Sequence, residues 1–230
     1  MISCGSKISM AAPPSNPGVG DPRKIAIVGA GGHARETALL LFQCGVAREH
    51  LAGFFVDDHY WSETSVEGLP LRRLGEFDPD HHVAIVAIGE SHARRKLVEQ
   101  LPVSTRFPAF VHPSVIAPTD LVVGEGVILH AGCIITTNVR LARHVQLNRG
   151  TQVGHDSVLG DFVTTAPGAV ISGNCTIGAC SYLGAMSSIR ERQVVGDGAT
   201  VGMGAVVVSN VPAHATYVGN PARPIARAPA

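Results

Sequence analysis

Aromatic side chains and charges are scarce in this 230-residue sequence. It holds seven Phe, three Tyr and one Trp, and its 18 basic and 18 acidic side chains cancel. This balance disfavours a basic nucleic-acid-binding module, a polyanion binder and a disordered chain. No stretch reaches the ~18 consecutive apolar residues of a membrane span. We therefore expect neither a nucleic-acid partner nor a membrane span.

Cysteines are also few, and none of them form a CxxC pair. The five are Cys4, Cys44, Cys133, Cys175 and Cys180. An odd number without close spacing indicates neither a disulfide framework nor a zinc knuckle, and a reducing, cytoplasmic location fits best. Residues 1–22 lack the apolar stretch of a signal peptide, so we interpret them as a flexible extension.

The sequence is rich in turn-forming residues, with 26 Gly and 15 Pro, which favours many short turns over a helical bundle. Strands and helices alternate in its first half, which predicts a small parallel sheet in an α/β, Rossmann-like domain over residues 23–112. The expected elements are a strand, glycine turn and helix from Lys24 to Gly45, strands at 51–56 and 83–89, a helix at 91–101, and a short strand with a hinge around 107–115.

An internal repeat fills the second half. Every sixth residue from position 123 to 207 is aliphatic in fourteen of fifteen cases, and the residue two before each is usually small or thin. The series is Val123, Leu129, Ile135, Leu141, Leu147, Val153, Leu159, Thr165, Ile171, Ile177, Leu183, Ile189, Val195, Val201 and Val207. Three such hexads close a triangular coil of 18 residues, and about five coils fit. Residues 18 apart should lie one above another, about one strand spacing apart.

The fold that we predict is therefore an α/β N-terminal Rossmann-like domain followed by an all-β parallel β-helix, with residues 113–230 forming the β-helix and a C-terminal tail. The hexads resemble those of the hexapeptide acyltransferases, and the left-handed sense of the helix is taken from that resemblance. Four stretches narrow the resemblance to one family: IAIVGAGGHA, FVDD, LNRGTQVGHDSVLGDFVTTAPGAVISGN and VGNPARPIA. They resemble the sugar acetyltransferase family of the bacillosamine-pathway and perosamine N-acetyltransferases and the sialic acid O-acetyltransferases. That resemblance implies cytoplasmic homotrimers that use acetyl-CoA and a nucleotide-linked sugar.

His155 is the residue that we expect to be the general base. It follows Val153 and Gly154 and so occupies a corner of the coil, where its imidazole is free to accept a proton near neutral pH. In the family that it resembles, the matching histidine is the proposed base, Asp156 matches an acidic residue that raises its basicity, and Asn148 matches an Asn that orients the histidine or the sugar. A turn role for Asn148 is as plausible.

Several residues are candidates for binding acetyl-CoA. Gly173 stands 18 residues after His155, so the two should flank one ligand, and its N–H is placed to bond the thioester oxygen. The resemblance adds backbone contacts at Ala185 and Met203, and it adds Thr164, where many relatives carry a histidine. Arg223 is a candidate partner for the CoA phosphates, although a solvated basic tail is an equal alternative.

The glycine turn of the front domain predicts an anion site. Gly29, Gly31, Gly32 and His33 open a helix whose N-terminal amides are free to bind a phosphate, and Asp57 follows the second strand. An NAD site is an alternative, but the domain is about half of a full dinucleotide fold. In the family that it resembles, this turn and the acidic pair matching Asp57 and Asp58 hold the nucleotide of a UDP-, dTDP- or GDP-linked sugar.

The function that we expect is acetyl-CoA-dependent N-acetylation of an amino sugar on a nucleotide-linked sugar, with acetyl-CoA as cosubstrate and no metal. O-acetylation of sialic acid or a related sugar by the same residues stays open, as do the acyl group, the nucleotide and the sugar. A zinc β-helix enzyme needs three converging histidines, and only His112 and His130 stack at the 18-residue spacing. A non-catalytic scaffold is the remaining alternative.

Outward-facing positions predict how the β-helix associates. Two faces are largely apolar, whereas the third (Ile128, Gln146, Thr164, Tyr182 and Thr200) is more polar. We therefore expect a homotrimer formed through the first two faces, with the cofactor between neighbouring helices.

Overall fold

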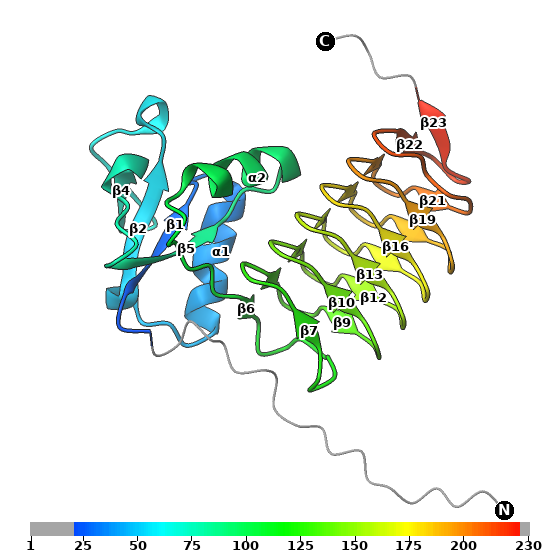
Figure 1. Cartoon of the computed structure of the whole chain (residues 1–230), viewed down its shortest axis with the longest axis horizontal. Helices are drawn as coiled ribbons and strands as arrows, with labels where there is room; N and C mark the ends of the chain where they lie inside the picture. Colours follow the sequence, from blue (N-terminus) through cyan, green and yellow to red (C-terminus); the bar gives the residue numbers. More distant parts are fainter. Residues whose placement is uncertain (1–20, 226–230) are drawn as a thin grey trace, which may run out of the picture.

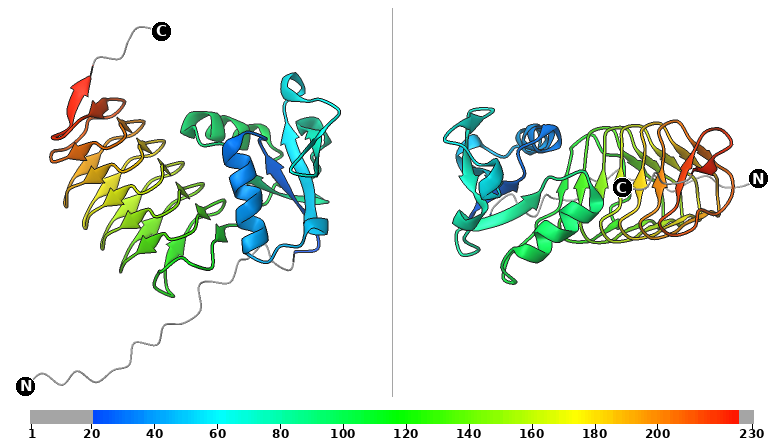
Figure 2. Two further views of the ribbon diagram at one scale, coloured as in Figure 1. Left: turned by 180° about the vertical axis from the view of Figure 1, so that it is seen from behind. Right: turned by 90° about the horizontal axis from the view of Figure 1, so that it is seen from above.

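Two units follow one another along the chain in the computed structural model, which describes residues 21–225 (Figure 1). An α/β domain comes first and lies beside the first coils of a parallel β-helix (Figures 1 and 2). The expected fold class is therefore confirmed. The expected extension over residues 1–22 lies outside the described residues except for its last two, of which Asp21 pairs with Arg23. Among residues 21–225, neither helix has the length and apolar character to cross a membrane.

The front domain is a five-stranded sheet with one helix on each face. Its strand order is β3-β4-β2-β1-β5, so the chain moves to one side of β1 and later returns to the other. Side chains alternate along β1: Ile25 and Ile27 pack with α1, whereas Ala26 and Val28 pack with α2. The elements are β1 (Lys24–Val28), α1 (Gly32–Gln43), β2 (Leu51–Val56), β3 (Ser65–Val66), β4 (Leu69–Arg73), β5 (His82–Val86) and α2 (Ser91–Gln100), with three short 3₁₀ helices at η1 (Arg48–His50), η2 (Asp58–Tyr60) and η3 (Leu74–Glu76).

The β3–β4 hairpin was not predicted by the sequence pattern. β4 pairs parallel with β2, and the backbone of Pro70 lies against Gly53 so closely that any side chain at Gly53 would collide with it. Gly53 has φ +125°, a conformation that favours glycine. The predicted strand at 83–89 is shorter than expected, because β5 ends at Val86 and the chain turns towards α2.

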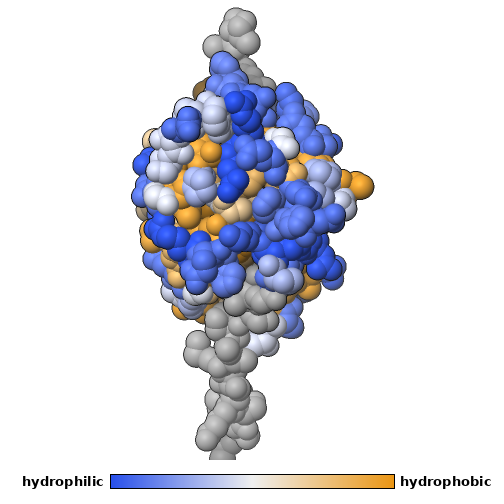
Figure 3. All heavy atoms as spheres, turned by 90° about the vertical axis from the view of Figure 1, so that its left-hand side faces the viewer, coloured by the Kyte–Doolittle hydropathy of each residue, from blue (hydrophilic) through white to orange (hydrophobic). Residues whose placement is uncertain are grey.

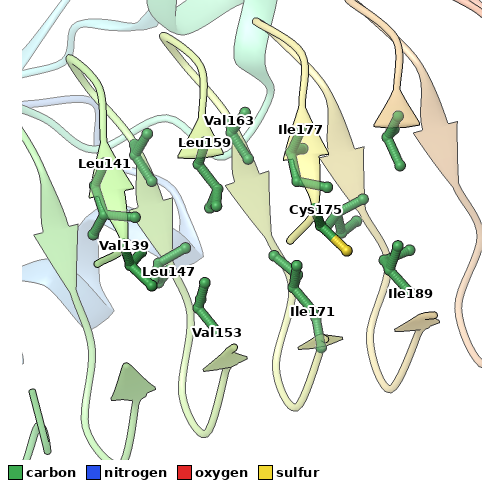
Figure 4. Close-up of a cluster of buried hydrophobic side chains, with 14 of the residues drawn as sticks. Val139, Leu141, Leu147, Val153, Leu159, Val163, Ile171, Cys175, Ile177 and Ile189 are labelled. Atoms are coloured by element: carbon green, nitrogen blue, oxygen red, sulfur yellow. The ribbon is translucent and has the colours of Figure 1, made fainter. Parts of the chain in front are cut away.

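Every predicted hexad forms a two-residue strand whose second residue packs into the core, as Figure 4 shows for part of the repeat. The strands are β7 (Val122–Val123), β8 (Ile128–Leu129), β9 (Ile134–Ile135), β10 (Arg140–Leu141), β11 (Gln146–Leu147), β12 (Gln152–Val153), β13 (Val158–Leu159), β14 (Thr164–Thr165), β15 (Val170–Ile171), β16 (Thr176–Ile177), β17 (Tyr182–Leu183), β18 (Ser188–Ile189), β19 (Val194–Val195), β20 (Thr200–Val201) and β21 (Val206–Val207). They stack into three parallel sheets of five strands each, and three further strands extend one of these sheets to eight.

Parallel pairing at a spacing of 18 residues holds through the repeat. Leu141 pairs with Leu159, which pairs with Ile177, which pairs with Val195, so the unusual sequence at 190–195 does not disturb the register. Thr165, the exception in the aliphatic series, is fully buried, and its hydroxyl hydrogen-bonds that of Thr151 at 2.8 Å. The hydroxyl pair lets a polar side chain occupy the core without an unsatisfied group.

The eight-stranded sheet carries the front domain. The chain enters this sheet at β6 (Phe110–Val111), which pairs with β8, and leaves it through β22 (Thr216–Val218) and β23 (Arg223–Ile225). The outward side chains of Ile128, Gln146 and Thr164 are buried. The face that we expected to stay out of association is thus occupied, over its first coils, by the chain's own front domain.

Candidate active site

His155 lies in the turn between β12 and β13. Its Nδ1 hydrogen-bonds Asp156 Oδ2 at 2.7 Å, and the other carboxylate oxygen accepts a hydrogen bond of 2.7 Å from Asn138 Nδ2. The bond from Asn138, and after it the one from His155, lowers the pKa of Asp156 below its usual value. An ionised carboxylate only accepts hydrogen bonds, so Nδ1 carries the proton and Nε2 is left as the basic nitrogen. About half of the His155 side chain is exposed to solvent.

Gly173 lies one coil above His155, as the 18-residue spacing predicts. A Cβ built on Gly173 would lie 2.5 Å from His155 Nε2, so the imidazole rests against the glycine backbone. Within the part of the chain that the structure describes, the Gly173 N–H donates no hydrogen bond. A basic nitrogen and an unused amide donor therefore sit side by side, the pair that acyl transfer requires.

Asn138 was missed by the sequence analysis. It stands 18 residues before Asp156, so the repeat that places Gly173 above His155 also places Asn138 below Asp156. The signal that would have found it was therefore present in the sequence. Applying the stacking rule downward as well as upward predicts a hydrogen-bonded series from Asn138 through Asp156 to His155.

Asn148 lies at a different edge of the β-helix from His155. Its turn joins the eight-stranded sheet to that of β12, whereas the His155 turn joins the two five-stranded sheets. The Asn148 side-chain oxygen accepts a hydrogen bond of 2.9 Å from the Arg149 N–H, and its carbonyl accepts one of 2.7 Å from the Thr151 hydroxyl. Within one chain, Asn148 thus stabilises its own turn and is not brought to His155.

The expected acetyl-CoA residues are dispersed in a single chain. Ala185 and Met203 stack at the same edge as Asn148, with the Met203 side chain exposed. Thr164 is only 4% exposed and lies beneath α2, with the Ser91 hydroxyl donating to its own at 3.3 Å. Arg223 is exposed on β23 and its Nη1 donates to the Ala222 carbonyl. The structure brings only Gly173 of this set to His155.

A cavity of about 650 Å³ opens at the carboxyl ends of β1 and β2, beside the first turn of α1. The strand order reverses between β1 and β5, and Ile88 in the loop after β5 also lines the cavity, so the cavity lies at the usual ligand position in such sheets. Gly29, Gly31 and Asp57 line it, as expected, together with apolar side chains from β2 and α2. Figure 3 shows the front-domain end of the molecule, where apolar surface lies exposed among hydrophilic side chains. Gly31 caps α1 without a side chain, which leaves the amides of the first turn open to an anion.

Other expected residues of this site lie differently. Asp58 pairs with Arg73 at 3.2 Å and lines an adjoining hollow of about 750 Å³. Gly32 begins α1 and is not among the residues that line the cavity. His33 turns away into the domain interface, where its Nε2 lies 2.9 Å from Gln146 Oε1 and burial lowers its pKa.

Two further residues line the cavity without a sequence signal to reveal them. Lys96 of α2 places a cation at the cavity, and Tyr60 of η2 contributes an exposed aromatic ring. Both residues belong to elements, η2 and α2, that are distant from the glycine turn in sequence and come close to it only through the packing of the sheet. Asp57 precedes η2, and its side chain caps none of the amides of that helix. The cavity thus combines helix amides, a cation, a carboxylate and apolar walls.

A zinc site finds no support in the arrangement of ligands. Among residues 21–225, no three His, Cys, Asp or Glu side chains gather at a metal-binding distance. His112 hydrogen-bonds Ser114, and burial lowers the pKa of His130 to about 3. The His112 and His130 column therefore has no third ligand.

Comparison with known proteins agrees with this geometry. Residues 24–101 match the family described as the PglD N-terminal domain. The chain is similar to the acetyltransferase domain of PglB from Neisseria gonorrhoeae, with 31% identity and a TM-score of 0.80 over 88% of this chain and 100% of that one. WeeI from Acinetobacter baumannii is 33% identical, with a TM-score of 0.82 over 88% of this chain and 100% of that one.

A third similar structure is a mutant of the perosamine N-acetyltransferase from Caulobacter crescentus, solved with CoA and GDP-perosamine. It is 26% identical, with a TM-score of 0.80 over 89% of this chain and 97% of that one. No curated protein matches the chain.

The β-helix, with an imidazole and an unused amide donor at one edge, fits an acyltransferase of the hexapeptide-repeat class. The similarity over nearly the whole chain then shows that this protein belongs to the hexapeptide-repeat sugar acetyltransferases, a family that includes the PglB acetyltransferase domain and perosamine N-acetyltransferase.

Proposed function

We propose that this protein transfers the acetyl group of acetyl-CoA to the amine of an amino sugar carried by a nucleotide. The observation that carries this proposal is the contact between His155 and Gly173, with Asp156 holding the imidazole. The relatives add the substrates: the PglB domain was solved with acetyl coenzyme A and perosamine N-acetyltransferase with CoA and GDP-perosamine.

In the proposed reaction the sugar amine attacks the thioester carbonyl carbon. His155 Nε2 takes the proton that the amine loses, and the Gly173 N–H donates to the developing oxyanion. The C–N bond forms, the C–S bond breaks, and the proton on His155 passes to the departing thiolate, so that CoA leaves as the thiol. Asp156 stabilises the imidazolium that exists between these two proton transfers.

The front-domain cavity suits the nucleotide part of such a substrate. The first-turn amides of α1 and the cation of Lys96 complement a pyrophosphate, and Asp57 is placed to accept hydrogen bonds from ribose hydroxyls. The apolar walls fit the face of a base. The nucleotide itself, whether UDP, dTDP or GDP, is left to experiment.

We further propose that the working form is a homotrimer. The front domain covers the first coils of the eight-stranded sheet, and His155 lies at the opposite edge, so the cavity and the proposed base of one chain lie on different sides of its β-helix. Ala185 and Met203 lie at yet another edge. A cosubstrate and a sugar that touch all these residues must therefore bind between neighbouring copies.

The test is a thiol-release assay with acetyl-CoA and a panel of UDP-, dTDP- and GDP-linked amino sugars, with free sialic acid as a separate arm. We expect one amino nucleotide sugar to be consumed, and we expect His155→Ala to lower kcat by ~10²–10⁴-fold with CoA affinity retained. Acetylation of sialic acid alone would favour the O-acetyltransferase alternative. If His155→Ala kept more than a tenth of the wild-type rate, the base would lie elsewhere.

A further inference from the structure

One side chain of the β-helix makes hydrogen bonds to three separate elements of the front domain. Gln146 on β11 is 1% exposed. Its Nε2 donates to the carbonyl of Val86 at the end of β5, at 2.7 Å. Its Oε1 accepts from His33 Nε2 at the start of α1, at 2.9 Å, and from Arg94 Nη1 on α2, at 3.2 Å.

Arg94 strengthens the same junction. Its side chain is fully buried, and burial lowers its pKa to about 10. Nη1 donates to the Ile88 carbonyl at 2.6 Å and Nη2 to the Phe162 carbonyl at 2.7 Å. No carboxylate within residues 21–225 forms an ion pair with it. A buried cation whose hydrogen bonds all go to carbonyl oxygens is costly, even with the Phe162 ring 6.0 Å from its guanidinium, which indicates that its fixed fork of donors is what the site requires.

The elements that Gln146 and Arg94 hold are the walls of the substrate cavity. Gly29 precedes α1 and Gly31 caps it, Ile88 lies in the loop before α2, and Lys96 is on α2 itself. The turn and the loop also touch, because a Cβ on Gly29 would lie 2.8 Å from Ile88 Cδ1. The distances between the glycine turn, the loop before α2 and α2 itself therefore depend on Gln146, which belongs to the β-helix.

We propose that Gln146 and Arg94 form a positioning unit by which the β-helix sets the walls of the front-domain cavity. Neither side chain touches the ligand; both act through α1, α2 and the end of β5. The inference depends on the proposed function only for the chemistry of the ligand, a nucleoside diphosphate.

The chemistry of position 146 makes the proposal testable. The primary amide of Gln146 donates to one carbonyl through its nitrogen while its oxygen accepts from two donors. Gln146→Met conserves the side-chain volume and removes all of its hydrogen bonds. Gln146→Glu keeps an oxygen that accepts from His33 and Arg94 but loses the bond to Val86. For the cation, Arg94→Lys keeps the charge and loses the fork. Arg95→Lys is the matched control on the same helix: Arg95 is exposed, pairs with Glu99 of its own helix and interacts with Cys180 of the β-helix, but among the described residues it makes none of the hydrogen bonds to Gln146, Ile88 or Phe162 that Arg94 makes.

Hydrogen exchange of the full-length oligomer is the first measurement. We expect Gln146→Met and Arg94→Lys to speed exchange at residues 29–34 and 86–93, with β-helix amides unchanged, and Arg95→Lys to leave both regions as in the wild type. The second is binding of UDP, dTDP, GDP and CoA. Affinity for the preferred nucleoside diphosphate should fall about tenfold and CoA affinity should stay within twofold.

Two results would overturn the positioning unit. One is unchanged hydrogen exchange at residues 29–34 and 86–93 in the variants. The other is faster exchange throughout the molecule with equal loss of CoA and nucleotide binding, as a general role in the domain interface would produce. If the wild type bound none of the three nucleotides while local exchange still rose in the variants, the positioning unit would stand and the nucleotide-sugar assignment would fall.

Discussion

At the scale of single residues, the proposed chemistry depends on how the imidazole of His155 is oriented. Asn138 fixes one oxygen of Asp156, and the other oxygen then accepts the Nδ1–H of His155. This arrangement directs Nε2 to the backbone of Gly173. An imidazole that a hydrogen bond already holds in place loses less rotational freedom on reaching its reactive geometry.

Asn138→Ala should therefore lower kcat by roughly 3- to 10-fold, less than the loss of His155 itself. The bond from Asn138 is the main cause of the low pKa of Asp156, so its removal raises that pKa. Asp156 then protonates, and ceases to accept from His155, at a higher pH. The acid limb of the kcat–pH profile should move upward. An unchanged acid limb would show that Asn138 has no part in the relay.

Asp57→Ala should raise the KM for the sugar substrate by about tenfold with kcat less affected, because the lost hydrogen bonds are the same in the ground and transition states. Asp58→Ala is the matched control, since Asp58 is engaged by Arg73. Steady-state kinetics with saturating acetyl-CoA would measure both. Equal effects of the two variants would contradict a specific role for Asp57.

At the scale of secondary-structure elements, the turns of the β-helix determine which side chains are buried. His144 occupies a turn beside the front domain, stacked on Phe162 at 4.9 Å with Phe107 against its edge. Its Nε2 is buried without a partner, and burial lowers its pKa to about 4. The unfolded chain binds a proton at this histidine near pH 6.5, whereas the folded chain does not until about pH 4.

The folded state should therefore lose stability as pH falls from about 6.5 to 4, and His144→Phe should remove part of this loss. The depressed pKa corresponds to about 2 kcal/mol of destabilisation at this one site between pH 7 and 5. Urea unfolding of wild type and variant at the two pH values would measure it. Phe is compatible with the turn, because Phe162 adopts the same left-handed backbone conformation as His144. A variant that kept the full wild-type pH dependence would refute this assignment.

At the scale of the whole molecule, exposed apolar side chains lie on the two sheets that the front domain leaves open. They are Ile116, Val122, Ile134, Val158 and Val194. The His155 edge lies between these sheets. Association through them would therefore bury apolar surface and enclose the reactive edge at the same time.

Val158→Asp should dissociate the proposed trimer and reduce activity by more than about tenfold at low enzyme concentration, because a buried unpaired carboxylate is costly. Val103→Asp is the control: Val103 is fully exposed on a loop of the front domain and should tolerate the change. Light scattering combined with the thiol-release assay measures both properties. A monomeric but fully active wild type would exclude a site shared between copies.

The sequence alone determined the β-helix and which residues stack at the edge that carries His155. A repeat of six residues places each inward side chain, and the spacing of 18 places Gly173 over His155 and Asn138 under Asp156. Such information is local, because each coil contacts only its neighbours and every strand repeats the same pairing. The glycine turn and the order of the first strands and helices were predicted for the same reason.

Only the tertiary structure decided how the two domains meet. His33 and Thr164 belong to motifs that suggested ligand binding, yet both lie in the interface, against Gln146 and Ser91. Lys96 reaches the cavity because α2 packs across the sheet, and Arg94 reaches the β-helix from the same element. These contacts join residues tens of positions apart in non-repeating sequence. They depend on how the packed surfaces of the two domains fit, which no periodicity in the chain encodes.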